Sequence, residues 1–197
     1  MTMIALHMSS PVTAVVLGAD RVGKSTIVNN TLERFKHKGL DAHFLHFSGP
    51  KPFHNSPIEQ YIEPFNQALD SYPEFVLCDR GFSEVCFYDD FRRRISISYE
   101  WAQSAESYFR DRSSSIHVFL IERDWEWSEP HHLKEVVEEN PDATAWWVKK
   151  RMEMRRNEHS AYYDYMHNYL HHYSLLPFTK ITDPEFDYDL IDHLLGV

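Results

Sequence analysis

The sequence predicts an α/β protein of three layers built on a five-stranded parallel sheet, because short apolar runs alternate with helical segments along the chain. Strands that alternate with helices pair in parallel and are covered on both faces. Two expected strands end in polar segments, at Gly18 and Asp79, and ligands in such sheets bind beyond the carboxyl ends of the strands. The 197 residues, 43% of them hydrophobic, suit one globular domain.

The expected strands are short runs rich in β-branched and aromatic residues, at 13–17, 42–47, 74–78, 116–121 and 178–182. The expected helices lie at 24–38, 58–69, 83–93, 99–112, 144–173 and 188–195. The first helix has Ile27, Leu32 and Phe35 on one side and ends before Gly39. The segment 144–173 is long enough for one amphipathic helix or for two.

Composition limits the environment and the partners of the chain. Residues 1–11 are expected to be a flexible leader and residues 12–197 a single domain. The formal net charge of −10 speaks against a broad basic surface for duplex DNA and leaves only a local patch open. Cys78 and Cys86 cannot form a disulfide framework, which favours a cytoplasmic location. No apolar stretch has the length of a membrane span, so we expect no membrane partner.

The strongest local signal is the segment Gly18-Ala19-Asp20-Arg21-Val22-Gly23-Lys24-Ser25-Thr26, which has the spacing of a P-loop. It follows a strand and opens a helix, as that motif requires. Glycines let the backbone wrap a phosphate, and the helix N-terminus adds positive potential. Five residues are therefore expected to hold the nucleotide: Gly18, Gly23, Lys24, Ser25 and Thr26.

Two charged residues lie inside this loop. Asp20 would repel a phosphate unless its carboxylate points away, toward a polar group of a second substrate. Arg21 could reach the transferring phosphoryl group of a nucleotide bound to the same chain, as an arginine finger does. The alternative for both is a solvated loop charge.

The segment from Gly18 to Thr26 resembles the P-loop of the thymidylate kinases, in particular the type with an arginine inside the loop. The resemblance extends to Cys78-Asp79-Arg80-Gly81-Phe82-Ser83, which is similar to that family's Asp-Arg segment. It also includes His46-Phe47-Ser48 and the stretch Arg155-Arg156-Asn157-Glu158, which is similar to the family's lid. The resemblance implies a P-loop kinase fold with a lid near residues 143–160, and ATP and Mg²⁺ as cofactors.

For the donor side, the resemblance implies that Lys24 and Arg21 stabilise charge on the migrating phosphoryl group. It implies that Ser25 holds Mg²⁺ and that Asp79 positions the ion through water. The residue types agree with the chemistry, since phosphoryl transfer depends mainly on positioning and charge stabilisation. An alternative for Asp79 is a turn or a helix cap after a buried strand.

For the acceptor side, the resemblance implies that Arg80 clamps the acceptor's phosphate and that Asp20 accepts a hydrogen bond from its sugar. It implies that Phe47 packs against the acceptor. Arg151 and Arg155 would be cations of the lid, and one helical turn separates them, so they share a face. A solvated basic helix face is the alternative for these two.

The sequence departs from the family where the acceptor's base is recognised. The family's phosphate-binding arginine after the second strand is replaced by Pro50, with Lys51 beside it. Between Phe53 and Cys78 the chain contains no Lys or Arg. The base is therefore expected to be held by stacking, amides or water, and the candidates are Gln60, Tyr61 and Gln67. The alternative for each of the three, which the pattern slightly favours, is an ordinary surface or core position.

Two other patterns have both a functional and an ordinary structural interpretation. His167 and His171 share a helical face, but no third ligand falls at a partner spacing, which favours a solvated pair over a metal site. Several tryptophans favour packing or the covering of a cleft, with base stacking as the alternative. They are Trp125, Trp127, Trp146 and Trp147.

The leading hypothesis is an ATP-dependent kinase that phosphorylates a deoxynucleoside monophosphate with a pyrimidine base. One alternative keeps the chemistry and places the acceptor, a hydroxymethylated pyrimidine, within DNA. Nucleoside kinases come third, and a nucleotide-binding regulator without catalysis represents a different class. Arg80 favours the kinase over the regulator, because a switch needs no cationic acceptor pocket. The sequence leaves a homodimer open.

Overall fold

The computed structural model describes residues 10–47, 59–71, 73–93, 99–183 and 188–197. Within them, one parallel sheet has the strand order β2-β3-β1-β4-β5. Its strands are β1 (Val12–Gly18), β2 (Ala42–His46), β3 (Phe75–Asp79), β4 (Ser115–Ile121) and β5 (Phe178–Ile181). The predicted three-layer α/β fold with five parallel strands is confirmed, and each expected strand is found within one residue at either end.

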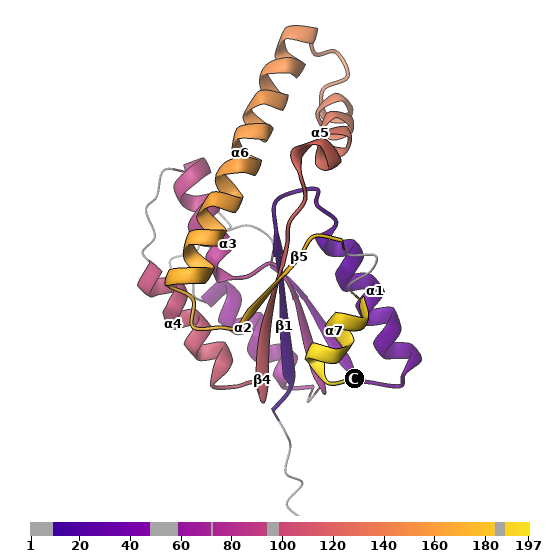
Figure 1. The fold of residues 1–197 in the computed structure, drawn as a ribbon, viewed down its shortest axis with the longest axis vertical. Helices are drawn as coiled ribbons and strands as arrows, with labels where there is room; N and C mark the ends of the chain where they lie inside the picture. The colour runs from indigo at the N-terminus through magenta and orange to yellow at the C-terminus, as the bar shows by residue number, and fades with distance from the viewer. Residues whose placement is uncertain (1–9, 48–58, 72, 94–98, 184–187) are drawn as a thin grey trace, which may run out of the picture.

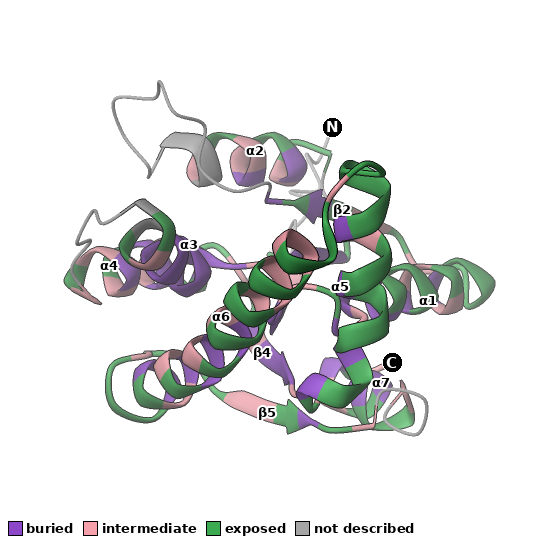
Figure 2. Cartoon of the chain, turned by 90° about the horizontal axis from the view of Figure 1, so that it is seen from above, coloured by how far each residue is buried: buried purple, intermediate pink, exposed green. Residues whose placement is uncertain are grey.

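Helices cover both faces of the sheet. The helices of the described residues are α1 (Lys24–His37), α2 (Glu59–Leu69), α3 (Phe82–Tyr88), the π-helix η1 (Asp89–Arg93), α4 (Tyr99–Arg110), α5 (Trp125–Glu139), α6 (Ala145–His172) and α7 (Tyr188–Leu195). Helices α1 and α7 lie on one face, and α2, α3 and α4 lie on the other (Figure 2). Of the expected leader 1–11, residues 1–9 lie outside the described part of the chain.

The core lies between these layers, where the central strands are buried along most of their length. The largest fully buried side chains include Phe35 of α1, Phe109 of α4 and Tyr162 and Tyr169 of α6. Helix α1 ends because Gly39 adopts a positive φ of 73°, after which the Leu40 amide donates back to the Phe35 carbonyl. Residue 39 thus stops the helix as its sequence indicates.

Helix α6 is one continuous helix rather than two, and Thr144 caps it by accepting a hydrogen bond from the Trp147 amide at 3.3 Å. Its lower half packs beside the sheet, and its upper half projects beyond the carboxyl ends of the strands together with α5 (Figure 1). This projecting pair contains residues 143–160. Their action as a lid stays a prediction.

Helix α5 is absent from the sequence-based prediction. Pro130 lies inside it, and an interior proline argues against a helix in any reading of the local pattern. The helix forms because Trp125, Ser128, His132 and Val136 recur at helical spacing and are buried. Packing against α6 therefore outweighs the local cost of the proline.

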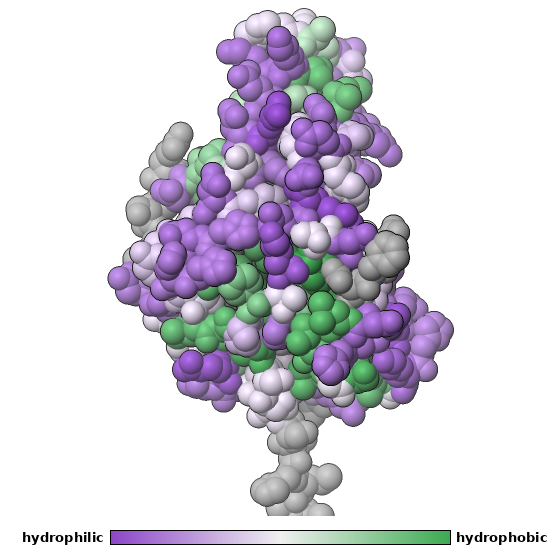
Figure 3. Space-filling model, viewed as in Figure 1, coloured by the Kyte–Doolittle hydropathy of each residue, from purple (hydrophilic) through white to green (hydrophobic). Residues whose placement is uncertain are grey.

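The visible surface is largely hydrophilic over the α5–α6 pair, with apolar side chains gathered lower down near the sheet (Figure 3). Within the described residues, the length and hydropathy needed to cross a bilayer are not found together in any helix.

Candidate functional site

The P-loop connects the carboxyl end of β1 to the first turn of α1. Gly23 has a positive φ of 92°, and a side chain at Gly18 would approach the Ile121 carbonyl oxygen to 2.9 Å. Both positions therefore need glycine, one for its backbone conformation and one for lack of space. Arg21 also has a positive φ, of 66°, so the loop carries strain beside its glycines.

Lys24 is buried under the loop. Its Nζ donates hydrogen bonds to the carbonyl oxygens of Gly18, at 2.5 Å, and Ala19, at 2.8 Å. Burial lowers the pKa of Lys24, and the nearby carboxyls of Glu84 and Asp20 oppose that shift. The ammonium is thus bonded to the backbone of the loop, and its role toward a phosphate stays a prediction.

Ser25 and Asp79 meet across the β1–β3 pair. The register pairs Val16 with Asp79, and the Ser25 hydroxyl donates to Asp79 Oδ2 at 2.7 Å. His46, at the end of β2, places Nδ1 3.2 Å from the same oxygen. The other carboxylate oxygen, Oδ1, is buried and has no hydrogen-bond partner within the described residues.

The Ser25 hydroxyl and the Asp79 carboxylate, whose Oδ1 has no partner within the described residues, fit a Mg²⁺ ion, which takes oxygen ligands and keeps several waters. Within the described part of the chain no group of three or more His, Cys, Asp or Glu residues could hold a metal by itself. These two side chains therefore suit an ion whose remaining ligands are phosphate oxygens of a nucleotide and water.

A charge cluster lies on the other side of the loop, around Asp20. Arg80 Nη2 is 3.0 Å from Asp20 Oδ1, and Arg92 Nη2 is 2.9 Å from Asp20 Oδ2. Both guanidinium groups lie over the ring of Tyr88, at 5.6 and 4.5 Å from its centroid. Burial acts to raise the pKa of Asp20, but the charges of Lys24, Arg80 and Arg92 outweigh it and hold that pKa well below its usual range.

Helix α6 joins this cluster through Glu158. Arg92 Nε donates to Glu158 Oε1 at 2.8 Å, and Arg155 Nη1 lies 3.8 Å from Glu158 Oε2. Arg155 also borders a small void of about 10 Å³ that Asp20 lines. Arg151 is separate, with its guanidinium 5.7 Å from the ring centroid of Trp147.

Two other predicted site residues, Arg21 and Phe47, contact side chains of the protein itself. Arg21 pairs with Glu135 of α5, with Nη2 2.7 Å from Oε1. Phe47 is only 4% exposed and lies near Phe82 and Phe109 in the core, so little of its ring is free for an acceptor. The roles assigned to these two side chains stay predictions.

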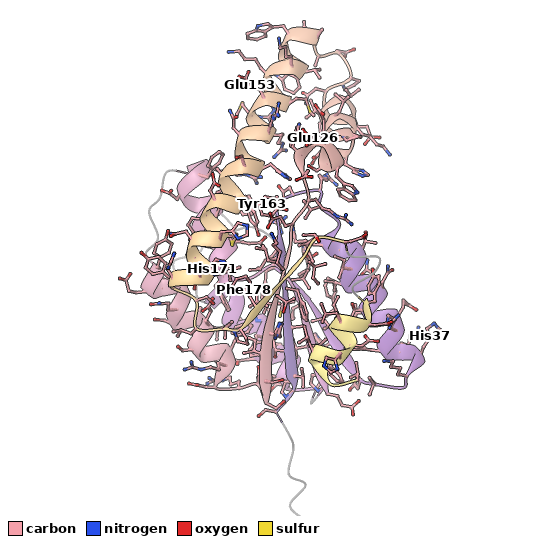
Figure 4. The ribbon with its side chains drawn as sticks, viewed as in Figure 1. His37, Glu126, Glu153, Tyr163, His171 and Phe178 are labelled. Carbon is pink, nitrogen blue, oxygen red and sulfur yellow. The ribbon has the colours of Figure 1, made fainter. Side chains whose placement is uncertain are left out.

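Below the loop, Glu84 of α3 supports Gly18. Its Oε1 accepts hydrogen bonds from the Gly18 amide and from the Tyr162 hydroxyl of α6. Burial raises the pKa of Glu84, although the Lys24 and Arg80 charges oppose this. Figure 4 shows neighbouring Tyr163 on the same helix, where its hydroxyl donates to the Ile121 carbonyl at 2.9 Å. Helix α6 is thus tied to the ends of β1 and β4.

A cavity of about 830 Å³ opens over the P-loop, which is within the range of small-molecule sites. Its walls come from the loop, from the ends of β2 and β3, and from α5. The lining residues from α5 are Trp127, His131, Lys134, Glu135, Glu138 and Glu139.

Each histidine of the predicted pair contacts a neighbouring side chain. His167 Nε2 is 2.8 Å from a Glu122 oxygen, and His171 packs edge-on against Phe178 at 5.0 Å between centroids (Figure 4). Of the base-reading candidates, Gln67 is exposed and does not line the cavity. Pro50, Lys51 and Phe53, and the side chains of Gln60 and Tyr61, lie outside the described part of the structure.

Sequence reasoning missed Arg92, Glu158 as its partner, and the whole α5 wall. The only available signal for Arg92 was its place in a basic run at 92–94, which by itself indicates a solvated surface. For α5, the buried helical spacing was present but was obscured by Pro130.

No protein-family model matches the chain, and no curated protein sequence matches it. Solved structures do. Polyphosphate kinase 2 from Arthrobacter aurescens TC1 superposes with a TM-score of 0.54 and 14% identity, over 95% of this chain and 67% of that one. A tRNA delta(2)-isopentenylpyrophosphate transferase from Staphylococcus epidermidis gives a TM-score of 0.56 and 8% identity, over 94% of this chain and 99% of that one. The likeness shows a P-loop kinase-type fold.

Proposed function

We propose that this chain transfers the terminal phosphoryl group of ATP to the phosphate of a deoxynucleoside monophosphate with a pyrimidine base. The observation that carries the proposal is the pair of arginines, Arg80 and Arg92, that converge on Asp20 beside the P-loop lysine. A loop that only binds a nucleotide as a switch needs no second cationic site there. A phosphotransferase with an anionic acceptor does.

On the donor side, Lys24 would leave the loop carbonyls and bond the β- and γ-phosphate oxygens. Burial would make this charge effective, since a cation in a water-poor site stabilises developing charge strongly. Ser25 and Asp79 would hold Mg²⁺. When bound, that ion supplies charge neutralisation between the phosphates of the donor.

On the acceptor side, the two guanidinium groups would bind the acceptor's phosphate in place of the Asp20 carboxylate. Asp20, already ionised, would then be free to accept a hydrogen bond from the acceptor's sugar. A phosphate oxygen of the acceptor forms a bond to the γ-phosphorus as the bond to the β–γ bridging oxygen breaks. The products are ADP and the acceptor's diphosphate, and no proton has to be removed from an ionised acceptor oxygen.

The test is a screen with γ-labelled ATP and Mg²⁺ against nucleosides, nucleoside monophosphates, and single-stranded and duplex DNA with normal and 5-hydroxymethylated pyrimidines. Inorganic polyphosphate is included as a second donor, because one structural neighbour carries the name polyphosphate kinase. We expect label on deoxypyrimidine monophosphates. If only DNA is labelled, the acceptor is a nucleotide within DNA and not a free monophosphate. ATP binding without transfer to any acceptor would refute catalysis.

The matched control for the screen is Arg110→Ala. Arg110 lies on α4 with a half-exposed side chain, its Nε is 3.9 Å from Asp111 Oδ1, and it does not line the cavity. Its loss should leave transfer at the wild-type rate, whereas Arg80→Ala should not.

A further inference from the structure

We infer that Trp127 is the stacking platform for the base of the donor nucleotide, at the α5 wall of the cavity. The inference rests on the proposed function, because it needs a nucleoside triphosphate in the P-loop. It adds a binding residue for the part of the nucleotide that the loop itself does not contact.

Trp127 is placed beside the loop in a way that packing does not explain. It lies on the first turn of α5, lines the cavity together with Thr26, and is 41% exposed. Its Cη2 atom is 3.5 Å from where a side chain at Gly23 would begin. Trp125, two residues earlier, takes the structural role instead, because it is 8% exposed and stacks on His132.

The indole is held in position from behind. The Arg123 guanidinium lies 5.0 Å from its ring centroid, and the Arg123 side chain is 18% exposed and outside the cavity lining. His131, one helical turn along α5, lies 5.3 Å from the ring and also lines the cavity. The indole is therefore held by contacts with Arg123 and His131, while Trp127 still lines the cavity.

The charges around the cavity fix the direction of the nucleotide. Lys24 and Arg80 lie beside the loop, whereas α5 presents three carboxylates and one ammonium to the same space, from Glu135, Glu138, Glu139 and Lys134. Glu135 is paired with Arg21, and Glu138 lies 3.8 Å from Lys134 of the same helix, so the α5 wall carries more negative than positive charge. Phosphates are repelled from that wall and drawn to the loop, while a neutral base is not repelled.

The ligand class follows from this division. The group beside Trp127 should be uncharged, flat and aromatic, attached by a few bonds to the phosphates at the loop. A purine base has these properties and offers a larger stacking area than a pyrimidine. Stacking on one aromatic residue contributes about 1–3 kcal/mol per base, roughly a fivefold to 150-fold change in affinity.

The experiment measures calorimetric dissociation constants of the full chain, with Mg²⁺, for ATP and for inorganic tripolyphosphate, which has the phosphates but no base. The variants are Trp127→Ala and Trp127→Leu, the second of which keeps apolar bulk without a π face. Trp146→Ala is the matched control, because Trp146 is 66% exposed and does not line the cavity. We expect both Trp127 variants to bind ATP about tenfold or more weakly and tripolyphosphate unchanged.

Two results would overturn the inference. If the Trp127 variants lose affinity for ATP and for tripolyphosphate to the same extent, the ring only supports the loop. If they keep wild-type affinity for ATP, the base lies elsewhere. A wild-type chain that binds neither compound would instead refute the proposed function, so the two failures can be told apart.

Discussion

Removing Arg92 tests whether the arginine pair belongs to the acceptor. In Arg92→Ala, Asp20 keeps Arg80 at 3.0 Å and Glu158 keeps Arg155 at 3.8 Å. No carboxylate of the cluster is then left without a cation, so the fold should persist. We expect the acceptor's KM to rise while the KM for ATP stays at its wild-type value.

The magnitude follows from exposure. A hydrogen bond to a charged group contributes about 1.5–3 kcal/mol. The Arg92 side chain is 40% exposed, so solvent screening places the contribution of its hydrogen bond at or below the low end of that range. We therefore expect about a tenfold rise in the acceptor's KM, which corresponds to about 1.4 kcal/mol. Arg80 is 23% exposed, and its loss should cost more, about fiftyfold.

The assay is an initial-rate analysis in which the acceptor is varied at saturating ATP and then ATP at saturating acceptor. Arg92→Lys separates charge from geometry, since an ammonium keeps the charge but loses the bidentate fork. Arg110→Ala serves as the control. Thermal unfolding by circular dichroism checks that each variant is folded.

One pattern would refute the reasoning. If Arg92→Ala raises the KM for ATP and spares the acceptor, the arginine pair faces the donor, and Asp20 is not a placeholder for the acceptor's phosphate. An unchanged KM for both substrates would show that Arg92 only bridges η1 to α6 through Glu158.

Three further predictions concern the loop and its support. Lys24→Ala should lower turnover by about a hundredfold or more with unchanged helix content; near-normal turnover would contradict catalysis at the P-loop. Arg21→Ala should lower kcat, while Glu135→Gln, which frees Arg21, should preserve or raise it; equal losses in both would mark a structural pair. Burial raises the folded pKa of Glu84 above its ordinary 4.5, so the stability it contributes is complete below that value and is lost as pH rises through the folded pKa. The unfolding free energy of wild type should therefore fall relative to Glu84→Gln as pH rises, and the opposite slope in urea titrations would contradict the assignment.

The sequence determined the parts of the site that are contiguous in the chain. The P-loop could be predicted because its glycines, lysine and serine act through local backbone geometry at fixed spacing. The place of Asp79 followed from the same kind of reasoning, because parallel strands bring their carboxyl ends to one edge of the sheet. Strand boundaries were close for β1, β3 and β4 because each of these strands is largely a buried run of apolar residues.

Helix α5 shows where local pattern fails. Its interior Pro130 weakens any helical prediction, and only burial of Trp125 and His132 against the rest of the molecule identifies the helix. The cavity wall that α5 forms, and with it the place of Trp127, could not be reached from local propensity.

Tertiary structure alone decided how the charges pair. Arg92 is 72 residues from Asp20 and 66 from Glu158, so no periodicity in the sequence relates them. Arg21 and Phe47 show the same limit, since one is paired with Glu135 on α5 and the other is buried in the core. The physical reason is that an ion pair or an aromatic contact depends on distances of a few ångströms between side chains, and those distances are set by how helices pack, not by the spacing of residues along the chain.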